Sequence, residues 1–142
     1  MIIDAKNKVL GRLATRVARE AKDGEEVHVV NSEKAVISGS EEEIKDEYQT
    51  KHDRGTRHDG PYYPKAPDRI LKRAVRGMLP YKSSEGSEAF ERVRTYIGVP
   101  HELEEAEEVD AKEGTDLKHR NYVKLREVSK SMGWEKRVNP DE

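Results

Sequence analysis

Residues 7–31 read NKVLGRLATRVAREAKDGEEVHVVN, a helical pattern followed directly by a strand pattern. In the first part, apolar side chains recur at the spacing of one helix face. They are Val9, Leu10, Leu13, Ala14, Val17, Ala18 and Ala21. Gly24 is a natural helix terminator, and the alternation in residues 26–31 then favours a strand. The stretch therefore predicts an amphipathic helix next to a buried strand.

Strands and helices alternate along the rest of the chain as well. Short apolar segments predict strands at residues 1–3, 27–31 and 35–38, and alternating side chains predict another at residues 93–97. Ser40 and Glu43 form a capping box for a helix over residues 41–51. Further helices are expected over residues 68–79, capped by Asp68 and ended by Pro80, over a short segment capped by Ser87, and over residues 125–134. The order favours an α/β fold, a small sheet covered by helices.

The composition sets limits on the class of protein. A chain of 142 residues suffices for one domain, expected over residues 1–142 with a basic loop at 52–67 and an acidic extension from about 101. No apolar run is long enough to span a membrane. The N-terminus lacks a signal-peptide pattern, so a cytoplasmic location is expected. With no cysteine, disulfides and thiolate metal sites are excluded.

Charge is strongly segregated although the formal net charge is only −2. Residues 51–82 contain nine Lys or Arg and three Asp, so the remainder of the chain carries a net charge of −8. Residues 101–116 contain eight acids and one lysine. Segregation of this kind usually indicates a binding partner rather than a requirement of the fold.

The predicted helix over residues 68–79 is apolar on one side and cationic on the other. Its stripe consists of Arg69, Lys72, Arg73 and Arg76. Like charges at these spacings repel each other, whereas a phosphate backbone would neutralise them and release counterions. Gly77 indicates either close approach of a partner or early fraying before Pro80.

The first helix and the basic loop repeat this design. Lys8, Arg12, Arg16 and Arg19 line the helix side opposite its apolar arc. A single stripe of this kind is more often only a solvated face. In the loop, Lys51, Arg54, Arg57 and Lys65 alternate with His52, His58, Tyr62 and Tyr63, whose rings could stack on unpaired bases or merely anchor the loop. Together these segments favour RNA binding.

Two other classes of function stay open at this stage. A metal-dependent nuclease could use His52, Asp53, His58 and Asp59, although their spacing matches no defined site. A protein-interaction module could use the acids of residues 102–108. No phosphate-binding, dinucleotide-binding, serine-hydrolase or zinc-protease motif is present, so we expect no enzymatic activity, cofactor or metal.

Four segments, in this order, resemble the L-thirteen family of large-subunit ribosomal proteins. They are IIDAKNKVLGRLATRVA, EVHVVNSEKAVISG, RILKRAVRGMLPYK and RVRTYIGVPHE, and the later YVKLREVSKSMGW is similar to the archaeal branch. The resemblance implies a three-layer α/β/α domain around a four-stranded sheet. It also implies binding to large-subunit ribosomal RNA in the ribosome, neighbouring ribosomal proteins as partners, a role in assembly, and neither a membrane nor a small-molecule substrate.

Two features depart from the pattern of this family. Glu85 stands close to a position that is usually basic, although Lys82 is kept. The chain also has 29 acids against 27 bases, like proteins of salt-in halophiles. The predicted RNA-binding residues are Lys8, Arg12, Arg16, Arg19, Lys51, Arg54, Arg57, Lys65, Arg69, Lys72, Arg73, Arg76 and Lys82.

Overall fold

The computed structural model describes residues 1–53, 64–80, 82–100 and 122–134. The larger of its two sheets contains β1 (Ile2–Asp4), β2 (Val27–Val30) and β4 (Val93–Thr95), parallel and in the order β1-β2-β4. Ile3 lies opposite Val29, and Val29 opposite Thr95. Because β2 lies in the centre, its valines are completely buried, which explains its nearly continuous apolar sequence.

The second sheet is a correction to the expected single sheet of four strands. β3 (Val36–Ser38) pairs antiparallel with β5 (Tyr122–Lys124), a strand that the sequence pattern did not predict. The chain leaves β2 through Asn31, whose φ of 58° is left-handed, and then forms the 3-10 turn Ser32–Lys34. Asparagine tolerates this conformation better than most residues. The turn directs β3 away from the larger sheet, while the expected α/β class is confirmed.

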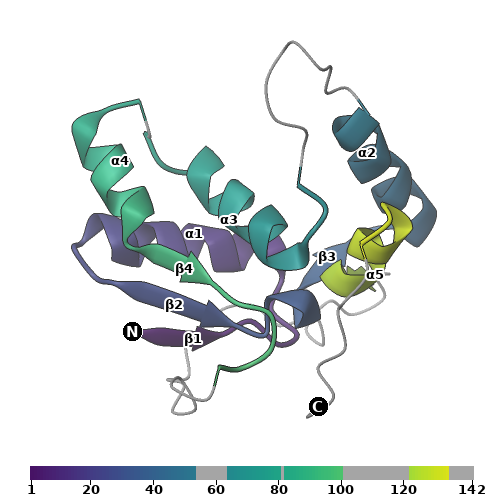
Figure 1. Ribbon diagram of the computed structural model, residues 1–142, viewed down its shortest axis with the longest axis horizontal. Coiled ribbons are helices and arrows are strands. Elements are labelled where there is room, and N and C mark those ends of the chain that lie inside the picture. Colours follow the sequence, from purple (N-terminus) through teal and green to yellow (C-terminus); the bar gives the residue numbers. More distant parts are fainter. Residues whose placement is uncertain (54–63, 81, 101–121, 135–142) are drawn as a thin grey trace.

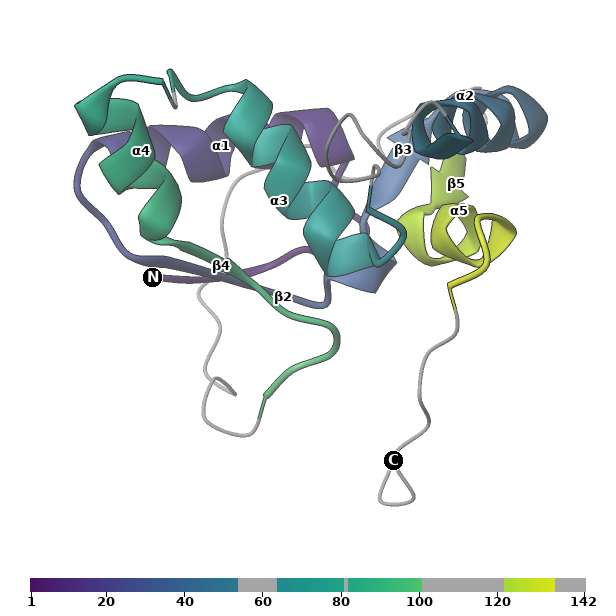
Figure 2. The ribbon, with the colours of Figure 1, turned by 45° about the horizontal axis from the view of Figure 1, so that its top comes forward.

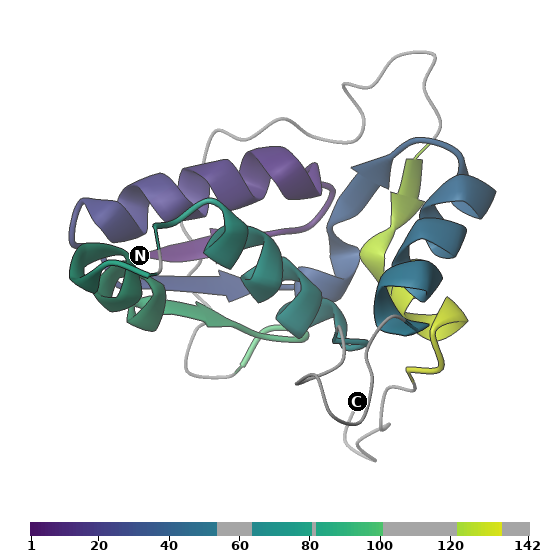
Figure 3. The same cartoon turned by 90° about the horizontal axis from the view of Figure 1, so that it is seen from above.

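Three helices lie on one face of the larger sheet, as Figures 1 and 2 show: α1 (Leu10–Lys22), α3 (Pro67–Gly77) and α4 (Ser84–Glu91). Seen from above, α2 (Glu41–Asp53) and α5 (Leu125–Ser131) lie beside the smaller sheet (Figure 3). The smaller sheet is tied to the start of α1, because the N–H of Val36 donates to the carbonyl of Lys8 at 2.9 Å. The two sheets thus belong to one packed domain.

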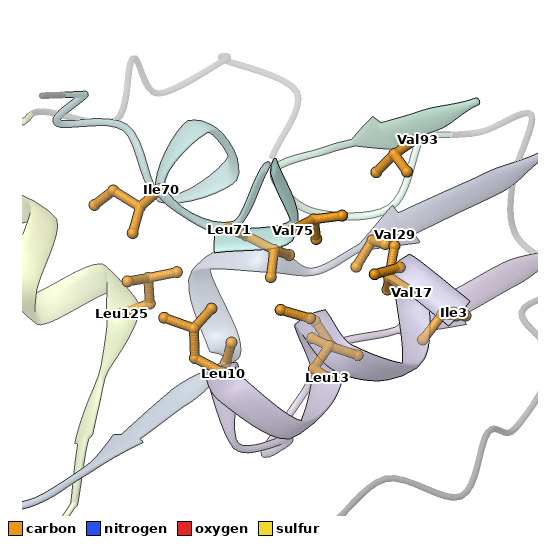
Figure 4. Close-up of a cluster of buried hydrophobic side chains, with 14 of the residues drawn as sticks. Ile3, Leu10, Leu13, Val17, Val29, Ile70, Leu71, Val75, Val93 and Leu125 are labelled. Atoms are coloured by element: carbon orange, nitrogen blue, oxygen red, sulfur yellow. The ribbon is translucent and has the colours of Figure 1, made fainter. Parts of the chain in front are cut away.

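The core lies between the helices and the larger sheet (Figure 4). The helices and the strands of the larger sheet all contribute side chains to it. They include Ile3, Leu10, Leu13, Val17, Val29, Ile70, Leu71, Val75, Val93 and Leu125. Leu125, at the start of α5, is completely buried near Leu10 and joins the smaller sheet to this core. The predicted apolar arc of the first helix is confirmed, since its residues from Leu10 to Ala21 are buried.

Two predicted helix caps are wrong. α3 begins at Pro67, with Ala66 as its N-cap, so Asp68 is inside the first turn. Proline favours that first position because its φ is already helical and its missing N–H is not needed there. α4 is capped by Ser83 rather than Ser87, and the Ser83 hydroxyl accepts a hydrogen bond from the N–H of Gly86 at 3.1 Å.

Candidate nucleic-acid interface

The helices α1 and α3 pack directly against each other and display arginines to solvent. The apolar side of each helix is buried, so the charged side must face outward. Arg12 and Arg19 are exposed on α1, and Arg69 and Arg73 are exposed on α3. Arg12 and Arg19 make no ion pair with any residue in the described part of the chain. Exposed arginines of both predicted stripes therefore stand on two helices that are packed together.

The other cations of the two stripes are half-buried. Arg16 is half-buried, and its Nε lies 3.1 Å from Oε1 of Glu20, close enough for an ion pair but without hydrogen-bond alignment. Lys72 extends across α4, where its Nζ lies 5.2 Å from the centre of the Phe90 ring. Such a cation–π contact is worth about 0.5–1 kcal/mol at an exposed position. Arg76 and Lys8 are half-buried.

Of the predicted loop cations, the structure describes Lys51 and Lys65. Lys51 belongs to the last turn of α2, where it pairs with Glu47 at 3.3 Å and lies over the ring of Tyr48. Lys65 is exposed, and its ammonium lies close to Gly133, which follows the end of α5. Lys82 is exposed between α3 and α4. The following lie outside the residues whose side chains are described: Asp53, Arg54, Arg57, His58, Asp59, Tyr62, Tyr63 and residues 101–121.

Asp68 is the one acid of α3, and it lies half-buried in the first turn of that helix. Burial raises the pKa of its carboxyl, while hydrogen bonds from the backbone N–H groups of Arg69 and Asp68 and the charges of Arg69 and Lys72 act against this rise. One carboxyl oxygen is buried without a hydrogen-bond partner. The main-chain carbonyl of Asp68 accepts a hydrogen bond from the Thr95 hydroxyl at 2.9 Å, and this bond fixes the start of α3 on β4.

The structure adds neighbours that the sequence analysis did not select. The hydroxyl of Thr15 donates to the carbonyl of Gly11 at 2.9 Å and lies 3.2 Å from the sulfur of Met78. This contact joins the middle of α1 to the end of α3. Lys22 is exposed at the end of α1, three residues after Arg19, and extending the predicted stripe by one turn would have found it.

Gly77 is exposed, and the structure gives no internal reason for a glycine there. Its φ is not positive, and a side chain of one carbon at this position would contact no other atom of the described chain. By contrast, Gly24 has a φ of 99°, which favours glycine for conformational reasons.

The described residues carry neither a cluster of metal ligands nor a membrane-spanning helix. There, no three histidine, aspartate or glutamate side chains are grouped as metal ligands would be. None of the helices described has both the length and the apolar character needed to cross a bilayer. The described fold is that of a small α/β protein whose two packed helices, α1 and α3, carry exposed arginines.

Comparison with known families identifies this class more closely. Residues 1–102 match the family model described as ribosomal protein L13. The chain therefore belongs to the ribosomal protein L13 family, so it is a structural component of the ribosome and not an enzyme. This membership confirms the expected family, the expected ribosomal location and the absence of catalysis.

Archaeal relatives match nearly the whole chain. A protein of Methanococcoides burtonii named large ribosomal subunit protein uL13 is 48% identical over 134 residues, which cover 93% of this chain and 96% of the relative. Proteins of the same name from Natronomonas pharaonis and Archaeoglobus fulgidus are 50% and 46% identical, each over 94% of this chain and over 90% and 87% of their own lengths. The similarity therefore continues beyond residue 102.

Proposed function

We propose that this protein is a constituent of the large subunit of the cytoplasmic ribosome and binds ribosomal RNA through the exposed faces of α1 and α3. The observation that carries the proposal is the direct packing of two helices whose outward faces display Arg12, Arg19, Arg69 and Arg73. The names of the archaeal relatives support the large subunit as its place. Its partners are then large-subunit RNA and the neighbouring ribosomal proteins, and its role is to support subunit assembly.

The exposed arginines of α1 and α3 support this proposal physically. α3 has a single carboxylate, Asp68, which lies half-buried at the start of that helix, so its exposed side chains are predominantly cationic. Planar guanidinium groups bind phosphates through two hydrogen bonds. Contacts of this kind position the protein on the RNA backbone without reading its sequence. If the protein works in molar salt, these direct hydrogen bonds supply more of the affinity, because counterion release is suppressed.

Next to α4 we assign only one residue to RNA. Glu85 is exposed in the first turn of α4, so a phosphate there would meet a negative charge. Lys82 lies just before that turn and is exposed, so it is the residue of this segment that we assign to RNA. The cations of the predicted loop complete the set, with Lys51 contributing from α2 rather than from a loop.

The test replaces Arg69, Arg73 and Arg76 of α3 with glutamine, which preserves side-chain length and helix propensity. A matched control replaces Arg94, Lys124 and Lys130, which are exposed on other elements, so that both triple variants lose the same charge. Binding to deproteinised large-subunit RNA is measured at several KCl concentrations. We expect the α3 variant to bind at least tenfold more weakly, with a smaller dependence on salt, and the control to bind nearly as the natural chain does. Equal losses in both variants would contradict a dedicated face.

A further inference from the structure

An open hollow lies where the second half of α1 meets the end of α3. Its volume is about 260 Å³, and it is lined by Thr15, Ala18, Arg19, Lys22, Asp23 and Met78. Ala18 is buried and forms part of the floor, while Arg19, Lys22 and Asp23 are exposed and form the rim. Met78 is 41% exposed although its sulfur lies only 3.2 Å from the Thr15 hydroxyl. The side chain is thus held in place with one side open.

The lining combines three kinds of chemistry. Ala18 and Met78 offer an apolar surface, and a thioether is a favourable neighbour for an aromatic ring. Arg19 and Lys22 offer positive charge at the rim, and Asp23 offers a hydrogen-bond acceptor next to them. A nucleotide presents the complement of each: a flat ring, a phosphate, and N–H donors on the edge of the base. The two cations make an anionic partner more suitable than a neutral or basic one.

The size of the hollow limits the partner further. A water molecule takes up about 30 Å³ in the liquid, so the hollow has the volume of roughly nine waters and can take a single flat ring. Bases within a duplex are stacked on both faces and cannot enter such a space, whereas unpaired bases can be turned outward, as sequence-specific RNA recognition requires.

We propose that this hollow binds one unpaired nucleotide of ribosomal RNA, with its base on Met78 and Ala18 and its phosphate between Arg19 and Lys22. The inference rests on the proposed RNA binding and adds to it a specific point of recognition. Gly77 directly precedes Met78 and leaves open space beside the hollow, so the sugar–phosphate chain can pass close to the end of α3.

The test compares Met78→Ala, which removes the apolar surface, with Met78→Leu, which keeps it. Both full-length variants are bound to deproteinised large-subunit RNA, and the reactivity of each unpaired base toward a base-modifying reagent is mapped. We expect Met78→Ala to weaken binding about fivefold and to make one base that the natural chain protects reactive, with the remaining footprint unchanged. Met78→Leu should preserve that protection. Because Met78 is exposed, thermal unfolding of the free variants should stay close to that of the natural chain.

The salt dependence of binding distinguishes the proposed base contact from the proposed phosphate contact. Lys22→Gln should reduce the slope of log affinity against log salt by about 0.7–0.9, the value expected for one lost phosphate contact. Met78→Ala should leave this slope unchanged. If Met78→Ala alters no base while the α3 variant still weakens binding, the hollow is not a nucleotide site and the proposed function stands. If the natural chain does not bind the RNA at all, both proposals are overturned.

Discussion

Replacing Gly77 by alanine should stabilise the free protein and weaken its binding to RNA. Gly77 is the last residue of α3 and has no positive φ, and a methyl group there would contact no other atom of the described chain. The substitution therefore introduces no clash within the protein. Alanine also restricts the unfolded chain more than glycine does, which is worth about 0.4–1 kcal/mol in unfolding free energy. For a chain of this length, we expect the midpoint of thermal unfolding to rise by roughly 1–5 °C.

In the complex the same methyl group should be unfavourable. If the RNA backbone lies against Gly77, the added carbon forces a shift at the contact, and a cost of about 1–2 kcal/mol would weaken binding roughly five- to thirtyfold. The assay measures thermal unfolding by circular dichroism and affinity for large-subunit RNA on the same preparation. Stability and affinity should move in opposite directions, which a purely structural role of the glycine does not produce.

Gly24→Ala serves as the matched control. With a φ of 99°, Gly24 has a backbone conformation that strains alanine, so this variant should lose stability while a correctly folded sample keeps its RNA affinity. A Gly77→Ala variant with a raised unfolding midpoint that bound RNA as well as the natural chain would refute a contact between RNA and Gly77. Gly77 would then be explained by fraying at the end of α3 alone.

The remaining predictions concern stability. Asp68→Asn should raise the unfolding free energy at neutral pH. Burial raises the pKa of Asp68 in the folded state, so its ionisation destabilises that state as the pH rises above the ordinary pKa of 3.8. Unfolding curves at several pH values should therefore show the gain in stability vanish below pH 3.8. Glu33 is only 4% exposed, and both of its carboxylate oxygens accept a hydrogen bond from the N–H of Gly98, at 2.8 and 3.2 Å. Glu33→Ala should therefore lower the free energy of chemical unfolding by about 2–4 kcal/mol and accelerate amide exchange at Gly98. Raising KCl to molar levels should increase both the helical circular dichroism signal and the unfolding midpoint. The reason is that the net charge of −8 outside residues 51–82 is then screened over a Debye length of about 3 Å. Full signal and stability in dilute buffer would contradict the halophilic interpretation.

Much of the local structure followed from the sequence because its causes are local. The period of apolar residues determined which side of α1 is buried, and every predicted residue from Leu10 to Ala21 lies in the core. The strands β1, β2, β3 and β4 were located to within a few residues for the same reason. The cationic side of each helix was predicted too, since a helix that buries one side must expose the other. The family resemblance is equally a property of the sequence alone.

Other features were decided only by tertiary structure, because they depend on residues far apart in the chain. β3 pairs with β5 after the left-handed turn at Asn31, and no pattern within either strand specifies that partner. Lys72 reaches Phe90 only because α3 and α4 both pack against α1. The hollow likewise requires residues 15–23 to meet Met78, across more than fifty residues of sequence. Sequence periodicity specifies which face of an element is buried, whereas the packing of distant elements determines which exposed groups become neighbours.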